Sequence, residues 1–156
     1  GYRYHVTGLL HDETGFPTNE PERGARVQRW LNAKVDQNRD MLVDYEEVGT
    51  ADAEIIVFAY GACSRSAKGA LQEARDRGHK VGLFRPRTIW PFPDVELRAA
   101  AAGARGILVV EMNLGQLSLE VERALAGSVE MRCLHRVGGD PILPNEILEA
   151  LEEFAR

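Results

Sequence analysis

The pattern of apolar positions in the central part of the chain predicts a series of buried strands. Residues 107–110, in the stretch GILVVEMNLGQL at 106–117, form an uninterrupted apolar run that is rich in β-branched side chains. Such a run is too short for a typical helix and indicates a strand that is covered on both faces. Residues 54–60 (EIIVFAY) form a second buried run, and residues 80–85 are predicted to be the next strand. Two further strands are expected at 42–48 and 130–137.

Segments with a helical period of apolar residues alternate with these strands. They begin at Ser64, at Asp94, after Asn113 and at Pro144. Another helix is predicted over 21–42, with apolar residues along one side: Val27, Trp30, Leu31, Val35 and Leu42. Because strands and helices alternate after this helix, we predict an α/β fold in which a mostly parallel sheet lies between layers of helices.

The first 20 residues differ from the rest of the chain. They hold three glycines and a proline without a sustained period, so we predict an extended arm or connector at 1–20 and a single α/β domain at 21–156. The chain starts with Gly1 and has no initiator methionine, which suggests a piece of a longer protein.

Composition narrows the class of protein. The chain has 156 residues, of which 44% are apolar and 28% charged, with a formal charge of -5. This is enough for one compact domain with a sizeable core. No apolar run approaches the roughly 20 residues that a membrane helix needs. The sequence also lacks the stripe of basic residues that nucleic-acid binding requires. Two cysteines are too few for a disulfide framework or a cysteine-based metal site, so we expect a protein of the reducing cytoplasm.

The turn that follows the strand at 107–110 carries polar residues that suit the start of a helix. Asn113 is predicted to be the N-cap, and Gln116 the reciprocal half of a capping box. Glu111 ends the strand, and a lone carboxylate there could serve as a general base. No second titrating partner is identifiable, so capping, or a hydrogen bond across an interface, is the preferred interpretation.

A second strand-to-helix turn, at 60–66, has the residues of a possible anion site. Free backbone N–H groups together with Ser64, Arg65 and Ser66 could hold a carboxylate or phosphate. Arg85, at the end of another strand, could bind the same anion. The turn has neither the Walker pattern nor the dinucleotide-binding pattern. The preferred alternative is that Ser64 caps the helix and that Arg65 points to water or to a neighbouring subunit.

Two further sets of residues suggest chemistry only weakly. Cys63 lies just ahead of a helix, where the helix dipole favours a thiolate, but a small structural cysteine is the better interpretation. The residues that resemble loose metal ligands lie in the glycine-rich arm without a helical HExxH spacing: His5, His11, Asp12 and Glu13. We therefore expect local hydrogen bonds or subunit contacts there, and no metal site.

The proline-rich segment at 86–93 is predicted to be a stiff loop, since three prolines exclude a helix or a central strand. Arg85, Arg87 and Thr88 lie at the carboxyl end of a strand, where loops often line a site. Trp90 and Phe92 lie close by in the sequence, and aromatic residues and arginine are enriched in interfaces. A partner surface is the preferred interpretation of this loop.

Four motifs together resemble one known family. They are YHVTGLLHDETGFPT at 4–18, YGACSRSA at 60–67, RPRTIWPFP at 85–93 and VVEMNLGQL at 109–117. In this order and spacing they resemble the C-terminal part of the α subunit of 2-oxoacid:ferredoxin oxidoreductases, and the resemblance spans nearly the whole chain. It implies a transketolase C-terminal-type domain: a three-layer α/β/α fold with a mixed five-stranded sheet whose first strand is an antiparallel edge strand.

The resemblance also implies the reaction of a whole enzyme. A thiamine diphosphate carbanion, with Mg²⁺, adds to a 2-oxoacid, CO₂ leaves, electrons pass through an iron–sulfur cluster to ferredoxin, and the acyl group goes to coenzyme A. In this family the thiamine cofactor lies between the N-terminal domain of the α subunit and the β subunit. No catalytic residue of the family can therefore be carried over to a position in this sequence.

We accordingly expect a non-catalytic assembly domain within an oligomeric enzyme. Its expected contacts with the rest of the α subunit or with the β subunit are His11, Arg87, Thr88, Trp90, Phe92, Glu111, Asn113 and Gln116. The alternatives are a regulatory module that binds an anionic metabolite through Ser64, Arg65, Ser66 and Arg85, or the equivalent domain of a 2-oxoacid dehydrogenase or a transketolase.

Overall fold

The computed structural model describes residues 8–155, and the chain divides into two compact units, Gly1–Leu42 and Val43–Arg156. The predicted division into an arm at 1–20 and a domain at 21–156 stays a prediction. In the structure, Arg23 and Arg26 of the helix that follows the arm form ion pairs with Glu13 of the arm. His5, one of the weak metal-ligand candidates, lies outside the described residues.

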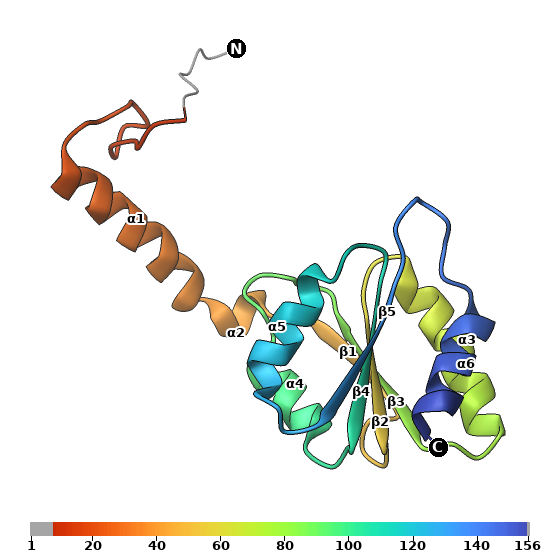
Figure 1. The fold of residues 1–156 in the computed structure, drawn as a ribbon. Coiled ribbons are helices and arrows are strands. Elements are labelled where there is room, and N and C mark those ends of the chain that lie inside the picture. Colours follow the sequence, from red (N-terminus) through yellow and green to blue (C-terminus); the bar gives the residue numbers. More distant parts are fainter. Residues whose placement is uncertain (1–7, 156) are drawn as a thin grey trace. The chain divides into compact units, whose positions relative to one another are not determined.

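The described part of the first unit consists of a turn and two helices. Helix α1 spans Pro21–Asp36 and α2 spans Arg39–Leu42, so the single helix predicted over 21–42 is interrupted at residues 37–38 (Figure 1). The interruption coincides with Asn38, whose side chain donates to the Lys34 carbonyl at 2.7 Å. Asparagine side chains compete in this way with the regular hydrogen bonds of a helix.

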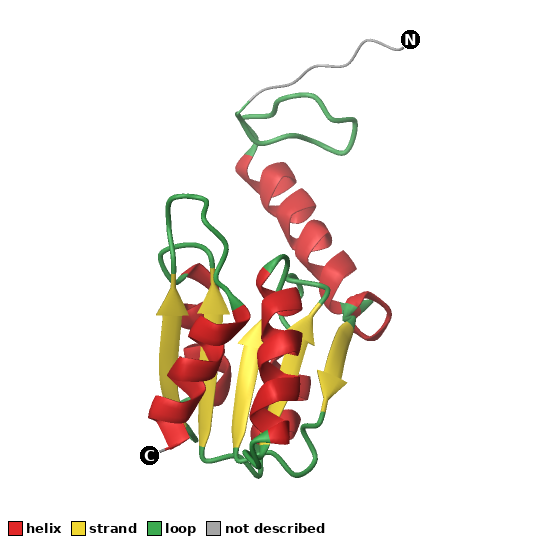
Figure 2. Cartoon of the chain, turned by 90° about the vertical axis from the view of Figure 1, so that its right-hand side faces the viewer, coloured by secondary structure: helices red, strands yellow, loops and turns green. Residues whose placement is uncertain are grey.

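The second unit is built on a five-stranded sheet with the order β1-β3-β2-β4-β5. The strands are β1 (Tyr45–Val48), β2 (Ile55–Ala59), β3 (Val81–Pro86), β4 (Gly106–Glu111) and β5 (Glu130–His135). Strand β1 pairs with β3 in the antiparallel direction, and every other pair is parallel (Figure 2). The predicted mixed sheet with an antiparallel first strand at one edge is therefore confirmed.

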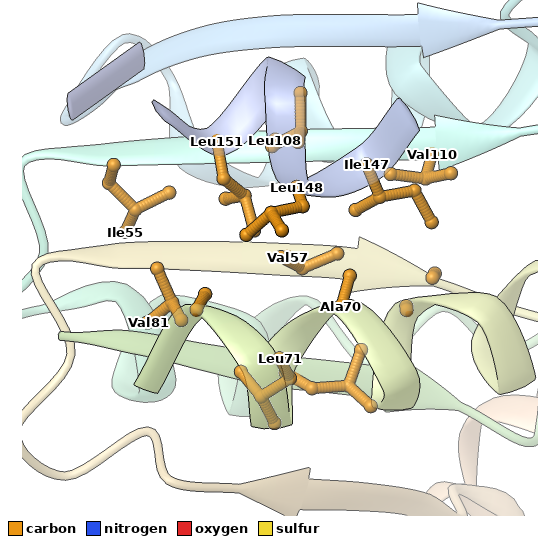
Figure 3. Packing of buried hydrophobic residues seen from close by; sticks show 14 of the residues in the cluster. Ile55, Val57, Ala70, Leu71, Val81, Leu108, Val110, Ile147, Leu148 and Leu151 are labelled. Atoms are coloured by element: carbon orange, nitrogen blue, oxygen red, sulfur yellow. The ribbon is translucent and has the colours of Figure 1, made fainter. Parts of the chain in front are cut away.

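Helices cover both faces of this sheet. They are α3 (Cys63–Asp76), α4 (Asp94–Ala101), α5 (Gln116–Leu125) and α6 (Pro144–Ala155). Val57, Leu108 and Val110 pack with α3 and α6 (Figure 3). Ile107 and Val109 pack instead with α4 and α5. Successive residues of one strand thus enter two different cores. This arrangement explains the uninterrupted apolar runs and confirms the three-layer α/β/α prediction.

None of the helices in residues 8–155 combines the length and the apolar character that crossing a membrane requires.

Candidate functional site

The sheet topology brings the ends of three strands together. Tyr60 follows β2, Glu111 is the last residue of β4 and His135 is the last residue of β5. Strands β2 and β4 are in register up to Ala59 and Val110, and Glu111 lies opposite His135. Because the three strands are parallel, their carboxyl ends meet at one edge of the sheet, where ligands and partners commonly bind in α/β proteins.

Glu111 is the centre of this cluster, and its side chain has no solvent exposure (0%). Its Oε2 accepts the Tyr60 hydroxyl at 3.0 Å and the Leu117 N–H at 3.1 Å. Its Oε1 accepts the Ser118 N–H at 3.0 Å and lies 3.4 Å from His135 Nε2. The carboxylate therefore joins the ends of the strands to the first turn of α5, where the helix dipole favours negative charge.

Asn113 completes the connection in a way that differs from the predicted cap. Helix α5 begins at Gln116, and its N-cap is Gly115, in the left-handed conformation with φ 97°. The Asn113 Oδ1 accepts the N–H groups of Gly115 at 2.7 Å and Gln116 at 3.1 Å, and its Nδ2 donates to the Tyr60 hydroxyl at 2.6 Å. Asn113 therefore satisfies a first-turn N–H, but from two residues ahead of the cap, and buried Glu111 satisfies the next two.

The charges of Glu111 and Tyr60 follow from these contacts. Burial raises the pKa of Glu111, but hydrogen bonding to Asn113, to the two backbone N–H groups and to Tyr60 outweighs burial and lowers this pKa below its usual value. Burial and the bond to Glu111 raise the pKa of Tyr60 to about 12. At neutral pH Glu111 is thus a carboxylate that accepts, and Tyr60 is a neutral phenol that donates.

Gly115, Ser118 and His135 fill the remaining space of this cluster. The Ser118 hydroxyl donates to the Gly115 carbonyl at 2.8 Å and lies 3.4 Å from His135 Nε2. A Cβ atom at Gly115 would lie 2.7 Å from His135 Cε1, so a glycine is required both by φ and by space. Sequence reasoning missed Tyr60, Ser118 and His135. The available signal was that Tyr60 and His135 lie at the carboxyl ends of two predicted strands, which the structure places on either side of β4.

The candidate anion site is largely occupied by contacts within the domain. The Ser64 side chain is buried and its hydroxyl donates to the Gly61 carbonyl at 2.7 Å. Arg85 donates to Glu46 at 3.1 Å, and Lys68 donates to the same carboxylate at 2.6 Å. Arg65 is exposed and Ser66 is partly buried. The structure thus does not bring the four predicted side chains together around one open site.

The described residues offer no ligand set for an iron–sulfur cluster or for a metal ion. Both cysteines are free, and Cys63 is buried, which raises the pKa of its thiol. Two cysteines cannot supply the four ligands of a [4Fe–4S] cluster. Groups of three or more His, Cys, Asp or Glu side chains that could hold a metal ion are absent from residues 8–155. We therefore assign no iron–sulfur or metal-ion chemistry to the described residues.

The residues expected at an interface have different surroundings. Trp90 is 69% exposed, whereas Phe92 is 4% exposed and packs in the core against Phe58, with ring centroids 6.1 Å apart. Phe92 and Glu111 thus belong to the interior of the domain. Arg87 lies 3.3 Å from Asp44, and the Thr88 N–H donates to the Asp44 carbonyl at 3.0 Å. In the first unit, His11 forms an isolated bridge with Pro17.

Exposed apolar side chains on the loops at the carboxyl end of the sheet were not predicted. Leu114, between Asn113 and Gly115, is 80% exposed. Val137, on the loop after β5, is also exposed, and the preceding Arg136 N–H donates to the Glu111 carbonyl at 3.1 Å. Hydrogen bonds to Asn113 and Glu111 therefore hold two loops whose apolar side chains, Leu114 and Val137, are exposed to solvent.

Comparison with known proteins supplies the family. Residues 53–147 match the family described as pyruvate:ferredoxin oxidoreductase core domain II. The 2-oxoglutarate synthase subunit KorA of Methanothermobacter thermautotrophicus is 45% identical over 100% of this chain and 42% of its own length. The KorA subunit of Methanocaldococcus jannaschii is 38% identical over 97% of this chain and 40% of its own length. The chain thus spans less than half of the length of these relatives.

A solved structure agrees with this assignment. The 2-oxoglutarate:ferredoxin oxidoreductase from Magnetococcus marinus, with 2-oxoglutarate, coenzyme A and succinyl-CoA bound, matches with a TM-score of 0.80 at 26% sequence identity. The match covers 99% of this chain and 27% of that chain. The resemblance stated from the four sequence motifs is therefore confirmed. The chain belongs to the family of pyruvate:ferredoxin oxidoreductase core domain II, the transketolase C-terminal-like domain of the α subunit of 2-oxoacid:ferredoxin oxidoreductases.

Proposed function

We propose that this chain is a non-catalytic assembly domain of the α subunit of a 2-oxoacid:ferredoxin oxidoreductase. The whole enzyme would decarboxylate a 2-oxoacid oxidatively to an acyl-CoA and reduce ferredoxin. Thiamine diphosphate, Mg²⁺ and the iron–sulfur cluster would be held by the N-terminal domain of the α subunit, by the β subunit or by other domains. This chain would contribute a surface at the carboxyl end of its sheet.

The observation that carries the proposal is the closed hydrogen bonding of Glu111. A general base needs a lone pair that can reach a substrate. Both carboxylate oxygens of Glu111 already accept hydrogen bonds from Tyr60 and from the first turn of α5, and the side chain has no exposed surface. Beside it, Leu114 is held at high exposure by a hydrogen-bonded turn. A rigidly held apolar side chain favours binding, because little conformational freedom is lost when a partner covers it.

The first substrate to test is 2-oxoglutarate. The relatives that align with 97–100% of this chain include 2-oxoglutarate synthase subunits at 38–45% identity. A ketoisovalerate oxidoreductase subunit VorB of Methanothermobacter marburgensis is 41% identical over 79% of the chain. We infer a whole enzyme that acts on 2-oxoglutarate, with residues outside this chain selecting the substrate.

A substitution at Leu114 in the full-length α subunit, co-expressed with the β subunit, tests the assembly role. We expect Leu114→Asp to abolish the αβ complex in size-exclusion chromatography with light scattering, and to abolish 2-oxoglutarate-dependent ferredoxin reduction with it. Leu119→Asp is the matched control, because Leu119 is an exposed leucine on α5. The control is expected to assemble and to remain active.

Two results would contradict the proposal. One is a Leu114→Asp enzyme that assembles normally; a loss of kcat in that assembled enzyme would in addition place this loop in the chemistry. The other is tight binding of thiamine diphosphate by the 156-residue chain alone in calorimetry, which would contradict a cofactor site outside it.

A further inference from the structure

The first unit contains a closed turn that precedes its main helix. The Asp12 Oδ1 accepts the N–H groups of Thr14 at 2.8 Å and Phe16 at 3.3 Å. The Asp12 N–H donates to the Phe16 carbonyl at 2.9 Å, and the Thr18 N–H donates to the Leu10 carbonyl at 2.8 Å. Residues 10–18 therefore have a defined conformation that the backbone and one aspartate maintain.

Ion pairs fasten this turn to the beginning of α1. Arg26 donates to Glu13 Oε1 from Nε at 3.0 Å and from Nη2 at 2.6 Å, and Arg23 lies 3.4 Å from the other oxygen of the same carboxylate. The hydrogen bond from Arg26 lowers the pKa of Glu13, which keeps it ionised. Leu10 covers Gly24 so closely that a Cβ there would lie 2.8 Å from Leu10 Cδ1. The turn and the helix thus form one structural element.

Large apolar side chains of the first unit are exposed to solvent. In the described part of the first unit, residues 8–42, no large apolar side chain is buried. The exposed ones are Leu9, Leu10, Phe16, Trp30, Leu31, Met41 and Leu42. A helix in a protein gains most of its stability by packing an amphipathic face, and a cluster of exposed apolar groups marks an interaction surface. Residues 8–42 therefore lack an apolar interior of their own, whereas the second unit has one.

A groove between the turn and α1 shows what kind of group would cover this surface. It has a volume of about 490 Å³ and is lined by Asp12, Glu13, Gly15, Arg26, Val27 and Trp30. The charged groups of its wall already bind one another or the turn, so they offer little to a charged ligand. Val27 and Trp30 supply the apolar part. The groove therefore suits an apolar protein segment.

We propose that the turn and the apolar face of α1 form a docking surface for the part of the α subunit that lies outside this chain. The inference rests on the proposed function, because it takes the chain to work within a longer α subunit. This docking surface would be covered within the α subunit. The exposed loop around Leu114, in contrast, is proposed to contact the β subunit.

The extent of the matches favours this occupant over others. The family match begins at residue 53, beyond the first unit, whereas the alignments with 2-oxoglutarate synthase subunits extend over 97–100% of the chain. The first unit therefore accompanies the domain in whole subunits without being part of the domain family. More than half of each relative lies outside the match. A partner in the same polypeptide has a high effective concentration, which favours it over a separate molecule.

Site-specific crosslinking in the full-length α subunit, co-expressed with the β subunit, identifies the occupant. The variant Leu31→p-benzoylphenylalanine carries a photoreactive residue at position 31. After irradiation, the adducts are mapped by mass spectrometry. We expect the adducts to join Leu31 to peptides of the same subunit that lie outside these 156 residues. The control is Arg29→p-benzoylphenylalanine, because two residues turn a helix by about 200° and Arg29 therefore lies on the opposite side. Its adduct yield is expected to be at least about five-fold lower.

Three crosslinking results would overturn the proposal: adducts to residues 43–156, adducts to the β subunit, or adducts between two copies of the subunit. Hydrogen exchange supplies a second measurement. In the full-length subunit, Leu31→Asp is expected to speed amide exchange in α1 about ten-fold, while Arg29→Asp leaves it unchanged. Fast exchange of α1 in the unsubstituted subunit would also overturn the proposal. If Leu114→Asp leaves assembly intact while the Leu31 adducts form as expected, the assembly role fails and this docking surface stands.

Discussion

The turns from β4 to α5 and from β2 to α3 have the same place in the fold but different chemistry. At the first turn, Glu111 accepts two N–H groups of the following helix from inside the domain, and Asn113 accepts a third. At the second turn, Ser64 donates to a carbonyl, and the helix has no side-chain cap. The first N–H groups of α5 therefore have acceptors inside the domain. The start of α3 has no such carboxylate and lies beside exposed Gly61 and Arg65.

This difference shows why a strand-to-helix turn is not by itself a site. A helix N-terminus attracts anions because its first N–H groups have no partner within the helix. When the preceding strand ends in an acidic residue that points inward, the protein supplies its own anion. At the turn from β4 to α5, the protein therefore supplies this anion itself, through Glu111.

The largest expected effect comes from removing the carboxylate. Glu111→Ala leaves two backbone N–H groups, Tyr60 and His135 without their partner, so we expect the free energy of unfolding to fall by about 3–4 kcal/mol. At the other turn, Ser64→Ala removes one neutral hydrogen bond and should cost about 1 kcal/mol. Urea denaturation of the 156-residue chain measures both. Equal losses at the two turns would contradict the contrast between them.

The glycines of the two turns give a second test. Gly115 has φ 97° and a Cβ there would lie 2.7 Å from His135 Cε1, whereas Gly61 has φ 55° and open space around it. Both substitutions to alanine strain the backbone by about 1–2 kcal/mol. Only Gly115→Ala adds overpacking, so we expect it to cost about 1 kcal/mol more than Gly61→Ala in the same denaturation experiment. If Gly61→Ala is the more damaging change, the first turn is not the tightly packed one.

A smaller effect is expected at Asn113. Asn113→Ala removes the acceptor for the Gln116 N–H and a donor to Tyr60, and we expect a loss of about 1 kcal/mol in thermal or urea unfolding. Asn113→Asp keeps the acceptor and serves as the control. A loss of αβ assembly at unchanged thermal stability would show that Asn113 acts at an interface and not only in capping.

The smallest effect is a change in how stability depends on pH. The pKa of Glu111 in the folded protein lies below its value in the unfolded chain, about 4.3. The carboxylate therefore stabilises the fold above that pH, and this contribution is lost as the pH falls through the lower folded pKa. Glu111→Gln should make unfolding less dependent on pH below about 4.3 than in the unsubstituted chain. The free energy of unfolding is measured by urea denaturation at several pH values between about pH 3 and about pH 6. If it changes with pH equally in Glu111→Gln and in the unsubstituted chain, the lowered pKa of Glu111 is contradicted.

Much of the second unit was predictable because its central strands are buried on both faces. Residues 55–59 and 107–110 are apolar throughout, and an apolar run of this length indicates a strand covered on both sides. The helices between them follow from their period and from the glycines and prolines at their ends. The position of α5 was predicted less well, because its first residues are held by Glu111, which lies outside the local capping pattern.

The candidate site was predictable only in part. Glu111 and Asn113 were identified because they follow an apolar run, but their partners Tyr60 and His135 are far away in the sequence and meet them only through strand pairing. Phe92 was expected at a partner surface because aromatic residues and arginine are enriched in interfaces, and the structure places it in the core against Phe58. Trp90 and Phe92 point in different directions although they lie in the same proline-rich loop. The local sequence does not indicate which of the two side chains packs in the core.

The sequence by itself determined the order of strands and helices, the burial of the central strands and, through four motifs, the family. These properties depend on local periodicity and on the residues of short segments. Only the tertiary structure decided that Glu111 is satisfied from within, that Ser64 and Arg85 are engaged separately, and that α1 belongs with the preceding turn. Each of these depends on contacts between distant segments, because hydrogen bonding and burial are set by what the folded chain brings near a side chain.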